Sequence, residues 1–289
     1  MKLTTRTGIE VRRSVPHANL RKIGAWCFVD HFGPTVQSEG MVVAAHPHTG
    51  LQTVTWLFDG AIDHRDSIGT KQTITPGQLN LMTAGKGISH SELSLANNES
   101  LHAVQLWIAL PGEVRNQAPA FEHQTELPVV TFGDASIKVL VGEFSGAKAP
   151  TKVFSDLVGL EIRIPAGKTI QIELNPEFEY GLLSAQGGVL AGVSSLEEIT
   201  ESNLGFWPTG NSSLNIEAKS EDVIAILLGG RPMAEKILMW WNFIGRTHEE
   251  IVEARSQWNQ RSARFGQFED DIGDWIPAPD LPNLVLQPR

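Results

Sequence analysis

The stretch VVAAHPHTGLQTVTW, residues 42–56, carries His46 and His48 one residue apart, after an apolar run and before a glycine. Successive side chains of a β-strand alternate between its two faces, so residues two apart point the same way. If the chain is extended from here to residue 58, the two imidazoles converge on one face. Three further side chains share this parity: Gln52, Trp56 and Phe58. An isolated His-x-His pair also occurs at strand ends and turns, so this stretch alone leaves both a metal site and a polar strand end open.

A second segment, AGKGISHSELS at residues 84–94, repeats the spacing with His90 and Glu92. The two pairs together offer three imidazoles and one carboxylate, and a barrel can bring strands that are distant in sequence side by side. Four protein ligands with two open positions would then form one site. Imidazole and carboxylate ligands suit iron, manganese, nickel, copper or zinc, and they disfavour calcium and magnesium. Neither pair offers a cysteine, which argues against a structural zinc site.

Short strand-like segments separated by turn residues make up most of the chain. Those of the first half are residues 51–58, 61–68, 71–75, 79–84 and 100–110. Those of the second half are residues 135–144, 158–167, 168–176, 180–192, 213–220 and 222–230. Residues 112–128 lack the pattern and are interpreted as a linker between two domains. Strand–turn units at this spacing predict a β-barrel or a β-sandwich in each half.

The C-terminal region has a different pattern, typical of one helix. Thr247 is followed three residues later by Glu250, which is a capping-box signature. Ile251, Ala254 and Trp258 then fall on one helical face. We therefore expect a C-terminal helix that packs on a barrel, followed by an extended, proline-rich tail.

Composition narrows the classes of partner. The chain has 23 basic and 33 acidic residues, a net charge of −10, and 41% hydrophobic residues. This charge argues against direct nucleic-acid binding in the absence of a local basic patch. No apolar run approaches the ~20 residues of a membrane helix, and the first residues lack the apolar region of a secretory signal. Cys27, the single cysteine, excludes an intrachain disulfide and is expected to be buried and unreactive. These features predict a cytoplasmic protein, or a nuclear one in a eukaryote.

The remaining histidines do not form a similar pattern. His64, in the segment DHRDS, is interpreted as a surface residue or as one that supports a metal ligand. The others lie in loop-like, strand-like or helix-start contexts: His17, His31, His102, His123 and His248. The chain has no G-x-S-x-G motif of a serine hydrolase, and the glycines of residues 181–192 match neither a dinucleotide fingerprint nor a P-loop.

Several long motifs, in this order, resemble the pirin family of the cupin superfamily over nearly the whole chain. They are FVDHFGP (28–34), HPHTGLQTVTWLFDG (46–60), PGQLNLMTAGKGISHSE (76–92), LHAVQLWIALP (101–111), YGLLSAQGGVLAG (180–192) and MWWNFIGRTHEEI (239–251).

The resemblance implies an all-β bicupin fold, two jelly-roll-like β-barrels packed face to face, with a C-terminal helix. The implied domains are residues 1–125, which bind the metal, and residues 126–289, which do not and which include the helix and tail. The implied ligands of one mononuclear metal are His46, His48, His90 and Glu92. Fe(II) is the metal most often found in the family, with Mn, Ni, Cu and Zn as alternatives. The absence of histidine between residues 124 and 247 agrees with a metal-free second barrel.

One position departs from the general cupin pattern. Cupins often place a glutamate four residues after the second histidine of the His-x-His pair, and here that position is Gln52. A glutamine supplies no anionic ligand, which favours Glu92 as the sole carboxylate. The site is then one negative charge poorer, which would alter the potential of the metal or the choice of substrate.

For function, the resemblance implies a metal-dependent dioxygenase that acts on quercetin, a related flavonol or another enolisable aromatic compound with O₂. Glu92 would be the catalytic base that takes the proton of the substrate hydroxyl, and Trp56 and Phe58 would line the pocket. The alternative is a metal-dependent regulatory protein that binds a transcription factor or a metabolic enzyme, since some members of the family do so. A monomer is expected, as in the family.

Overall fold

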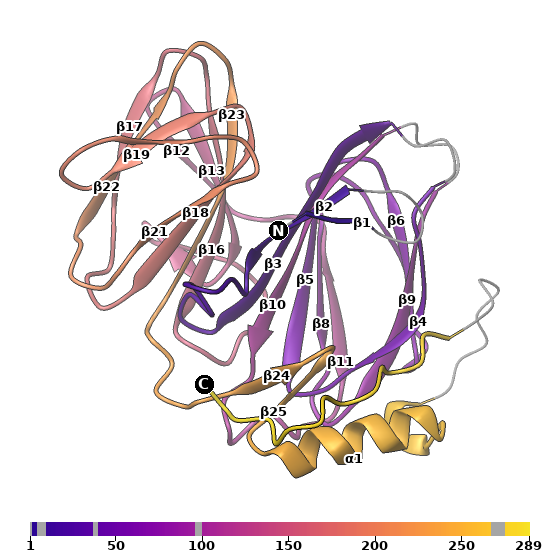
Figure 1. Ribbon diagram of the computed structural model, residues 1–289. Helices are drawn as coiled ribbons and strands as arrows, with labels where there is room; N and C mark the ends of the chain where they lie inside the picture. Colours follow the sequence, from indigo (N-terminus) through magenta and orange to yellow (C-terminus); the bar gives the residue numbers. More distant parts are fainter. Residues whose placement is uncertain (1, 5–9, 37–39, 96–99, 267–274) are drawn as a thin grey trace. The chain divides into compact units, whose positions relative to one another are not determined.

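The computed structural model describes residues 2–4, 10–36, 40–95, 100–266 and 275–289 (Figure 1). Strands dominate, and the predicted all-β fold is confirmed. The chain divides into two compact units, each of which contains one barrel. The first unit comprises Lys2–Val11, Phe32–His123 and Ala234–Arg289, and the second comprises Arg12–His31 and Gln124–Met233. No helix among the described residues is long and apolar enough to cross a membrane.

The first unit contains a four-stranded sheet and most of a seven-stranded sheet. The seven-stranded sheet has the order β1 (Lys2–Thr4), β2 (Glu10–Val15), β3 (Trp26–Val36), β10 (Ser100–Ala109), β5 (Leu51–Asp59), β8 (Leu79–Thr83), β11 (Ala120–Gln124). Its strands β2 and β3 also include residues assigned to the second unit. The four-stranded sheet has the order β4 (Val42–His48), β9 (Ile88–Ser94), β6 (Ile62–Asp66), β7 (Lys71–Ile74). Leu57 and Ala103 of the larger sheet meet Ile62 and Ile74 of the smaller in one buried cluster. The inner faces of the two sheets therefore pack on each other.

Strand β11 lies within the segment that the sequence pattern assigned to a linker. It is the last strand of the seven-stranded sheet, next to β8. Its residues are half-buried or exposed, with no run of β-branched residues, so they give little strand signal. Pairing with β8 decides the conformation of this segment.

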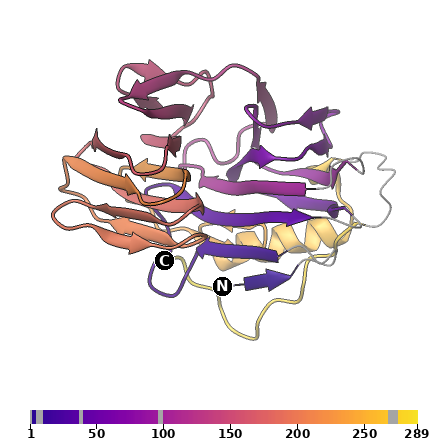
Figure 2. The ribbon, with the colours of Figure 1, turned by 90° about the horizontal axis from the view of Figure 1, so that it is seen from above.

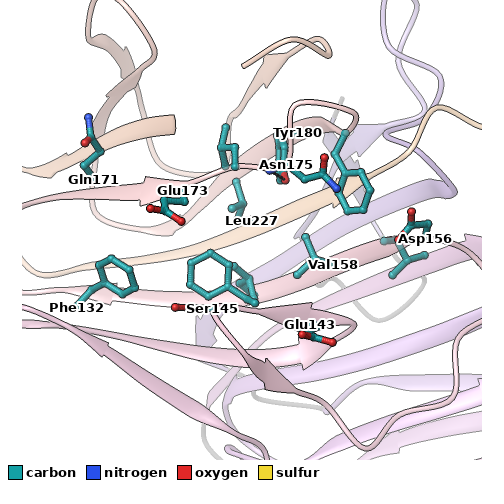
Figure 3. A pocket seen from close by; sticks show the side chains of 15 residues that line it. Phe132, Glu143, Ser145, Asp156, Val158, Gln171, Glu173, Asn175, Tyr180 and Leu227 are labelled. Atoms are coloured by element: carbon teal, nitrogen blue, oxygen red, sulfur yellow. Dashed lines mark hydrogen bonds between the residues drawn. The ribbon is translucent and has the colours of Figure 1, made fainter. Parts of the chain in front are cut away.

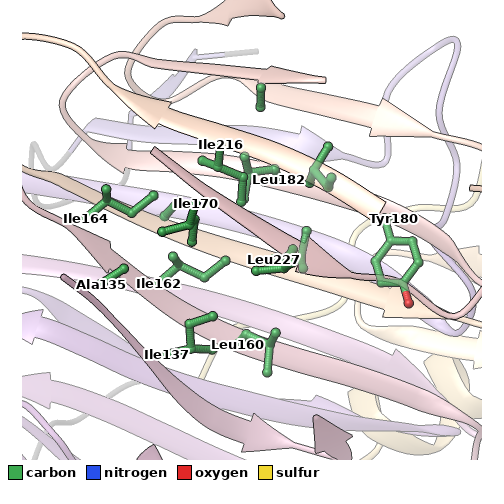
Figure 4. Packing of buried hydrophobic residues seen from close by; sticks show 14 of the residues in the cluster. Ala135, Ile137, Leu160, Ile162, Ile164, Ile170, Tyr180, Leu182, Ile216 and Leu227 are labelled. Carbon is green, nitrogen blue, oxygen red and sulfur yellow. The ribbon is translucent and has the colours of Figure 1, made fainter. Parts of the chain in front are cut away.

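The second unit repeats the arrangement. Its six-stranded sheet has the order β12 (Val129–Phe132), β13 (Ala135–Val141), β16 (Leu157–Ile164), β23 (Val223–Gly230), β18 (Glu179–Gln186), β21 (Leu204–Trp207). Its four-stranded sheet has the order β17 (Thr169–Glu173), β22 (Ser213–Ala218), β19 (Val189–Gly192), β20 (Glu197–Ile199). A hairpin of β14 (Glu143–Phe144) and β15 (Ala147–Lys148) follows β13. Aliphatic side chains such as Ile162, Ile170 and Ile216 fill the space between the two sheets (Figure 4).

The two barrels have one topology. The order β3-β10-β5-β8 in the first corresponds to β16-β23-β18-β21 in the second, and β4-β9-β6-β7 corresponds to β17-β22-β19-β20. Each pair of corresponding strands also has the same place in chain order. The structure thus shows one fold twice, where the strand pattern of the sequence predicted a β-barrel or a β-sandwich in each half.

Two chain segments belong to the unit opposite to the one expected from a boundary near residue 125. Residues 12–31 lie in the second unit, where the Trp26 indole N–H donates to the Gly229 carbonyl at 3.2 Å. Residues 234–289 lie in the first unit, with the C-terminal helix α1 (His248–Asn259). The ribbons in Figures 1 and 2 show both segments by colour.

Helix α1 joins the first unit because its apolar face is buried there. The Thr247 hydroxyl accepts the Glu250 N–H at the helix start, as the capping box predicts. The buried residues Ile251, Ala254 and Trp258 cluster with β25 (Phe243–Gly245) and the short 3₁₀ helix η1 (Ala263–Phe265). Nearby, β24 (Leu238–Trp240) pairs with β25. Beyond the helix, the Ile276 N–H donates to the Ala45 carbonyl at 2.8 Å, so the tail runs beside β4 (Figure 1).

Gly50 forms the turn between β4 and β5, which lie in different sheets. Its φ is 71°, and a Cβ added there would lie 2.3 Å from the Ile244 carbonyl oxygen. Both the backbone conformation and the space therefore require glycine. The alternation of inward and outward side chains that includes His46 and His48 on β4 therefore ends at this turn and does not continue into β5.

We predict that Gly50→Ala lowers the free energy of unfolding by about 3 kcal/mol, from the positive φ and the clash with Ile244 together. Gly133→Ala is the matched control, since Gly133 has a φ of 57° and no atom within 4 Å of its added Cβ. Its expected loss is about 1 kcal/mol. Urea unfolding of both variants measures the difference, and equal losses would contradict the steric argument.

Candidate metal centre

Three histidines of the small sheet meet inside the first barrel. His46 lies directly opposite His90 in the pairing of β4 with β9, and their ring centroids are 4.2 Å apart. His48, two residues along β4, places its Nε2 3.0 Å from Nε2 of His90. One ligand nitrogen of each ring lies within 4.8 Å of the others, and all three side chains are buried. The pairing of β4 with β9 thus brings together three histidines that strand parity had singled out.

Glu92 lies in the same interior, two residues beyond His90. A carboxylate oxygen of Glu92 and one nitrogen each of His64 and His90 lie within 4.8 Å of one another, and all three residues are buried. His90 is therefore common to both groups. The structure places the four predicted ligands, His46, His48, His90 and Glu92, in one connected cluster.

His64 is the residue whose role the sequence left least defined. It is buried on β6 and lies opposite Glu92 in the pairing of β6 with β9. Its Nε2 lies 3.1 Å from a carboxylate oxygen of Asp66, and its Nδ1 lies 3.4 Å from Nδ1 of His90. The available signal was its spacing from Asp66, another i, i+2 pair on a strand.

Hydrogen bonds around the cluster select which nitrogens are bare. An ionised Asp66 only accepts, so His64 donates from Nε2 and accepts at Nδ1, where the Nδ1–H of His90 donates to it. Nε2 of His90 then carries a lone pair. His46 donates from Nδ1 to the Ala44 carbonyl at 2.9 Å, which leaves its Nε2 bare as well. Such outer hydrogen bonds orient metal-binding histidines in many proteins.

The charges of the cluster are set by burial. Burial lowers the pKa of His46 to about 4. Burial and the neighbouring His46 lower the pKa of His48 and His90 well below their ordinary value. Burial raises the pKa of Glu92, while His64 and a hydrogen bond from Thr55 oppose that rise. The three imidazoles are therefore neutral near pH 7, which is the form that binds metals.

The larger sheet forms the wall opposite the histidines. The residues on its inward face differ in part from those that the sequence predicted. Thr55 reaches Glu92, and the ring of Trp107 meets that of His48 edge-on at 5.0 Å. Trp56 and Phe58 have the other parity along β5, so the guess that they line the pocket is wrong. The reason is the turn at Gly50, which resets the alternation.

Gln52 faces away from the histidines for the same reason. It is fully buried, and its amide donates to the Thr83 hydroxyl at 2.9 Å. The side chain at this position therefore supports strand packing between β5 and β8.

Strand β11 completes the wall beside His64. The ring of Phe121 stacks on His64 at 4.6 Å with an interplanar angle of 28°. Nδ1 of His123 lies 2.7 Å from the Asn80 side-chain oxygen on β8. Phe121 and His123 are only half-buried. Neither residue was predicted to belong to the site, because residues 112–128 lack a strand pattern and were interpreted as a linker.

The donor set fits a divalent transition metal. In the hydrogen-bond pattern above, the Nε2 atom of His90 directs a lone pair at Nε2 of His48, 3.0 Å away. A neutral His48 can donate its Nε2–H to that lone pair, or, in the other tautomer, the two nitrogens can bind one cation between them. Because burial keeps these imidazoles neutral, and a buried carboxylate lies beside His90, the donor set suits a transition metal with nitrogen and carboxylate ligands.

The second barrel has apolar residues at the corresponding positions. When Ile216 of β22 is aligned with His90 of β9, the printed strand registers align the rest. Ile170, Ile172, Val189, Ala191 and Ala218 then replace His46, His48, His64, Asp66 and Glu92 in that order. All of these residues of the second barrel are buried. Its described interior therefore offers no ligands at the positions that form the cluster in the first barrel.

Comparison with known families agrees with this pair of barrels. The family model Pirin matches residues 8–108. The family model Pirin C-terminal cupin domain matches residues 159–266. The chain belongs to the pirin family. The resemblance seen in the sequence motifs is thus confirmed.

Curated relatives cover nearly the whole chain. A Pseudomonas aeruginosa protein, provisionally named a quercetin 2,3-dioxygenase, is 42% identical over 277 residues, which are 95% of this chain and 87% of that protein. A pirin-like protein of Caulobacter vibrioides is 32% identical over 94% of both chains.

Solved structures show the same fold. The crystal structure of a quercetin 2,3-dioxygenase from Acinetobacter baumannii has a TM-score of 0.94 and 41% identity, and covers 100% of this chain and 95% of that chain. A bacterial pirin from Escherichia coli, solved in complex with nickel(II), has a TM-score of 0.63 and 20% identity. That match covers 81% of this chain and 96% of that chain.

We predict that His48→Ala or His90→Ala lowers metal affinity at least 100-fold, because each removes one nitrogen of the cluster. Metal content after dialysis, measured by elemental analysis, checks this. The exposed His17 provides the control, and His17→Ala should retain the metal of the unmodified protein. Retention of metal by both cluster variants would place the metal elsewhere.

The low pKa of His46 predicts acid sensitivity of the metal-free protein. Its ordinary pKa is 6.5 and its folded pKa about 4, so between these values the unfolded chain binds more protons. Stability is therefore full above pH 6.5 and falls as the pH drops towards 4, by about 3 kcal/mol from His46. Urea unfolding of the metal-free protein between pH 7 and 4 measures the slope. His46→Gln should flatten it, and an unchanged slope would contradict the assignment.

Proposed function

We propose that this pirin-family protein is a metal-dependent dioxygenase that cleaves quercetin or a related flavonol with O₂. The observation that carries the proposal is the pair of Nε2 atoms of His48 and His90, 3.0 Å apart. It lies beside His46 and Glu92 in the buried interior of the first barrel. The names of the Pseudomonas and Acinetobacter relatives support the same reaction class.

In this proposal His46, His48, His90 and Glu92 hold one divalent ion, Fe(II) first and nickel(II) second. The nickel in the Escherichia coli pirin motivates the second choice. A bound divalent ion would polarise the 3-hydroxy and 4-keto groups of a flavonol and favour loss of the hydroxyl proton. Asp66 and His64 hold the His90 ring in the required tautomer.

Glu92 is the proposed base for that proton. It is buried, with Thr55 and His64 beside it. A carboxylate that binds the metal through one oxygen keeps its other oxygen for the substrate hydroxyl. The Thr55 hydroxyl has one proton, which it donates either to the Glu92 carboxylate or to the Gln105 side-chain oxygen at 3.1 Å.

The walls around the cluster suit a flat aromatic substrate. Trp107 lies edge-on to His48, and Phe121 is half-buried and stacks on His64. An aromatic ring of the substrate would pack on these two side chains and exclude water from the reacting atoms. Phe121→Ala should therefore raise KM more than it lowers kcat.

The test is turnover of quercetin under air by the protein loaded with Fe(II) or nickel(II), followed by loss of flavonol absorbance and by CO release. We expect Glu92→Gln to lower kcat about 100-fold, since it removes the base. Metal content is measured in parallel, because Glu92 is also a proposed ligand. Glu113→Gln, at an exposed position of the same unit, is the control.

Two results would count against this function. The first is an unmodified protein that carries metal and yet releases no CO above the level of the His46→Ala/His90→Ala variant. The second is a Glu92→Gln variant that keeps both its metal and its kcat. The first result would favour the regulatory alternative, for which partner capture with iron in each oxidation state is the next measurement.

A further inference from the structure

A separate cavity of about 610 Å³ lies in the barrel of the second unit. This volume is within the range of small-molecule sites in proteins, roughly 300 to 1,000 Å³. Figure 3 shows Val158 and Leu227 between Phe132 on one side and Tyr180 on the other. It is not the counterpart of the metal centre, because none of the six apolar replacements described above lines it.

The cavity opens at a seam between the two sheets of the barrel. Phe132 comes from β12, the first strand of the six-stranded sheet, and Glu173 comes from β17, the first strand of the four-stranded sheet. The β14–β15 hairpin adds Glu143 and Phe144. Its tight turn at Ser145 and Gly146, with φ values of 49° and 79°, puts Ser145 on the cavity wall as well.

The inner lining is apolar and aromatic. Phe132 and Phe144 lie with ring centroids 6.1 Å apart, and Phe178 and Tyr180 form a second pair at the same separation. The Tyr180 hydroxyl accepts the backbone N–H of Asn175 at 2.9 Å, which fixes the ring in the wall. Four aromatic rings around one space offer π-faces to an apolar or cationic ligand.

The charge of the lining has one sign. Glu143, Asp156 and Glu173 are acidic, and the lining contains no lysine, arginine or histidine. Asp156 is paired with Arg231 at 3.2 Å. Glu143 and Glu173 take part in no ion pair among the described residues, although Lys148 lies opposite Glu143 in the hairpin. Two carboxylates at the mouth of an aromatic cavity favour a cation and repel an anion.

We propose that the second barrel binds a small organic cation with an apolar body, such as an arylalkylamine, in this cavity. The ammonium group lies at the mouth between Glu143 and Glu173, and the apolar part lies among the rings of Phe132, Phe144, Phe178 and Tyr180. The anionic form of a flavonol, the substrate class proposed for the first barrel, is disfavoured here by charge. The metal-free barrel is thus a second ligand site of different specificity.

Tyr180 allows a direct test, because it is the only tyrosine of the chain. Protein labelled with ¹³C at the ζ carbon of tyrosine alone gives one labelled aromatic NMR signal, from the wall of the cavity. The signal is followed while tryptamine, the neutral tryptophol or the anionic indole-3-propionate is added to the full-length, metal-loaded protein. We expect tryptamine to shift it with a Kd on the order of 1 mM or tighter, and indole-3-propionate to bind about tenfold more weakly or not at all.

The double variant Glu143→Gln/Glu173→Gln isolates the charge contribution. Both positions are exposed, so the fold should be retained. We expect this variant to bind tryptamine about fivefold more weakly and tryptophol unchanged. Glu217→Gln is the matched control on the same four-stranded sheet, since Glu217 does not line the cavity, and it should bind like the unmodified protein.

Three outcomes would overturn the proposal. They are a Tyr180 signal that tryptamine leaves unmoved up to about ten times the expected Kd, equal affinity for indole-3-propionate, and unchanged tryptamine affinity in the double variant. Quercetin turnover is a separate measurement, since it depends on the first barrel alone. A failure of one proposal therefore leaves the other intact.

Discussion

The register of three paired strands is the constraint on which the metal centre depends. The β4–β9 and β6–β9 pairings place His46 and Asp66 on either side of His90, and His64 opposite Glu92. A shift of one residue in either pairing would turn an entire strand face outwards. The apolar contacts of Leu57, Ala103, Ile62 and Ile74 hold the two sheets together and so oppose such a shift. These apolar contacts thereby maintain the strand register that positions the histidines of the cluster.

In the second barrel the same strand register places apolar residues at the positions of the metal-site residues. Ile170, Ile216 and Ala218 occupy the places of His46, His90 and Glu92, and they form a closed aliphatic core. Buried isoleucine stabilises a barrel, whereas buried histidine and glutamate cost free energy unless they are hydrogen-bonded or bind a metal. One scaffold therefore carries a polar site in the first unit and a packed core in the second. The cavity between β12 and β17 is lined by other residues, and none of those that replace the metal-site residues of the first barrel contributes to it.

Residues 234–289 show which features local sequence signals predict and which features only tertiary contacts decide. The helix start at Thr247 and the buried face of Ile251, Ala254 and Trp258 followed from sequence, and the structure has both. The sequence did not predict which of the two units this apolar face packs against, because any apolar surface can bury it. The contacts with Phe243 and Phe265, and the bond from Ile276 to Ala45, assign the segment to the first barrel.

By itself the sequence determined the all-β class, the family, and the two pairs His46/His48 and His90/Glu92 that each share a strand face, because strand parity and motif order are local properties. Only the tertiary structure showed that His64 and Asp66 select the His90 tautomer, and that Phe121 and His123 belong to the wall. It also turned Trp56, Phe58 and Gln52 away from the site. The physical reason is that alternation ends at a turn such as Gly50, and pairing between distant strands decides which face is inward beyond it.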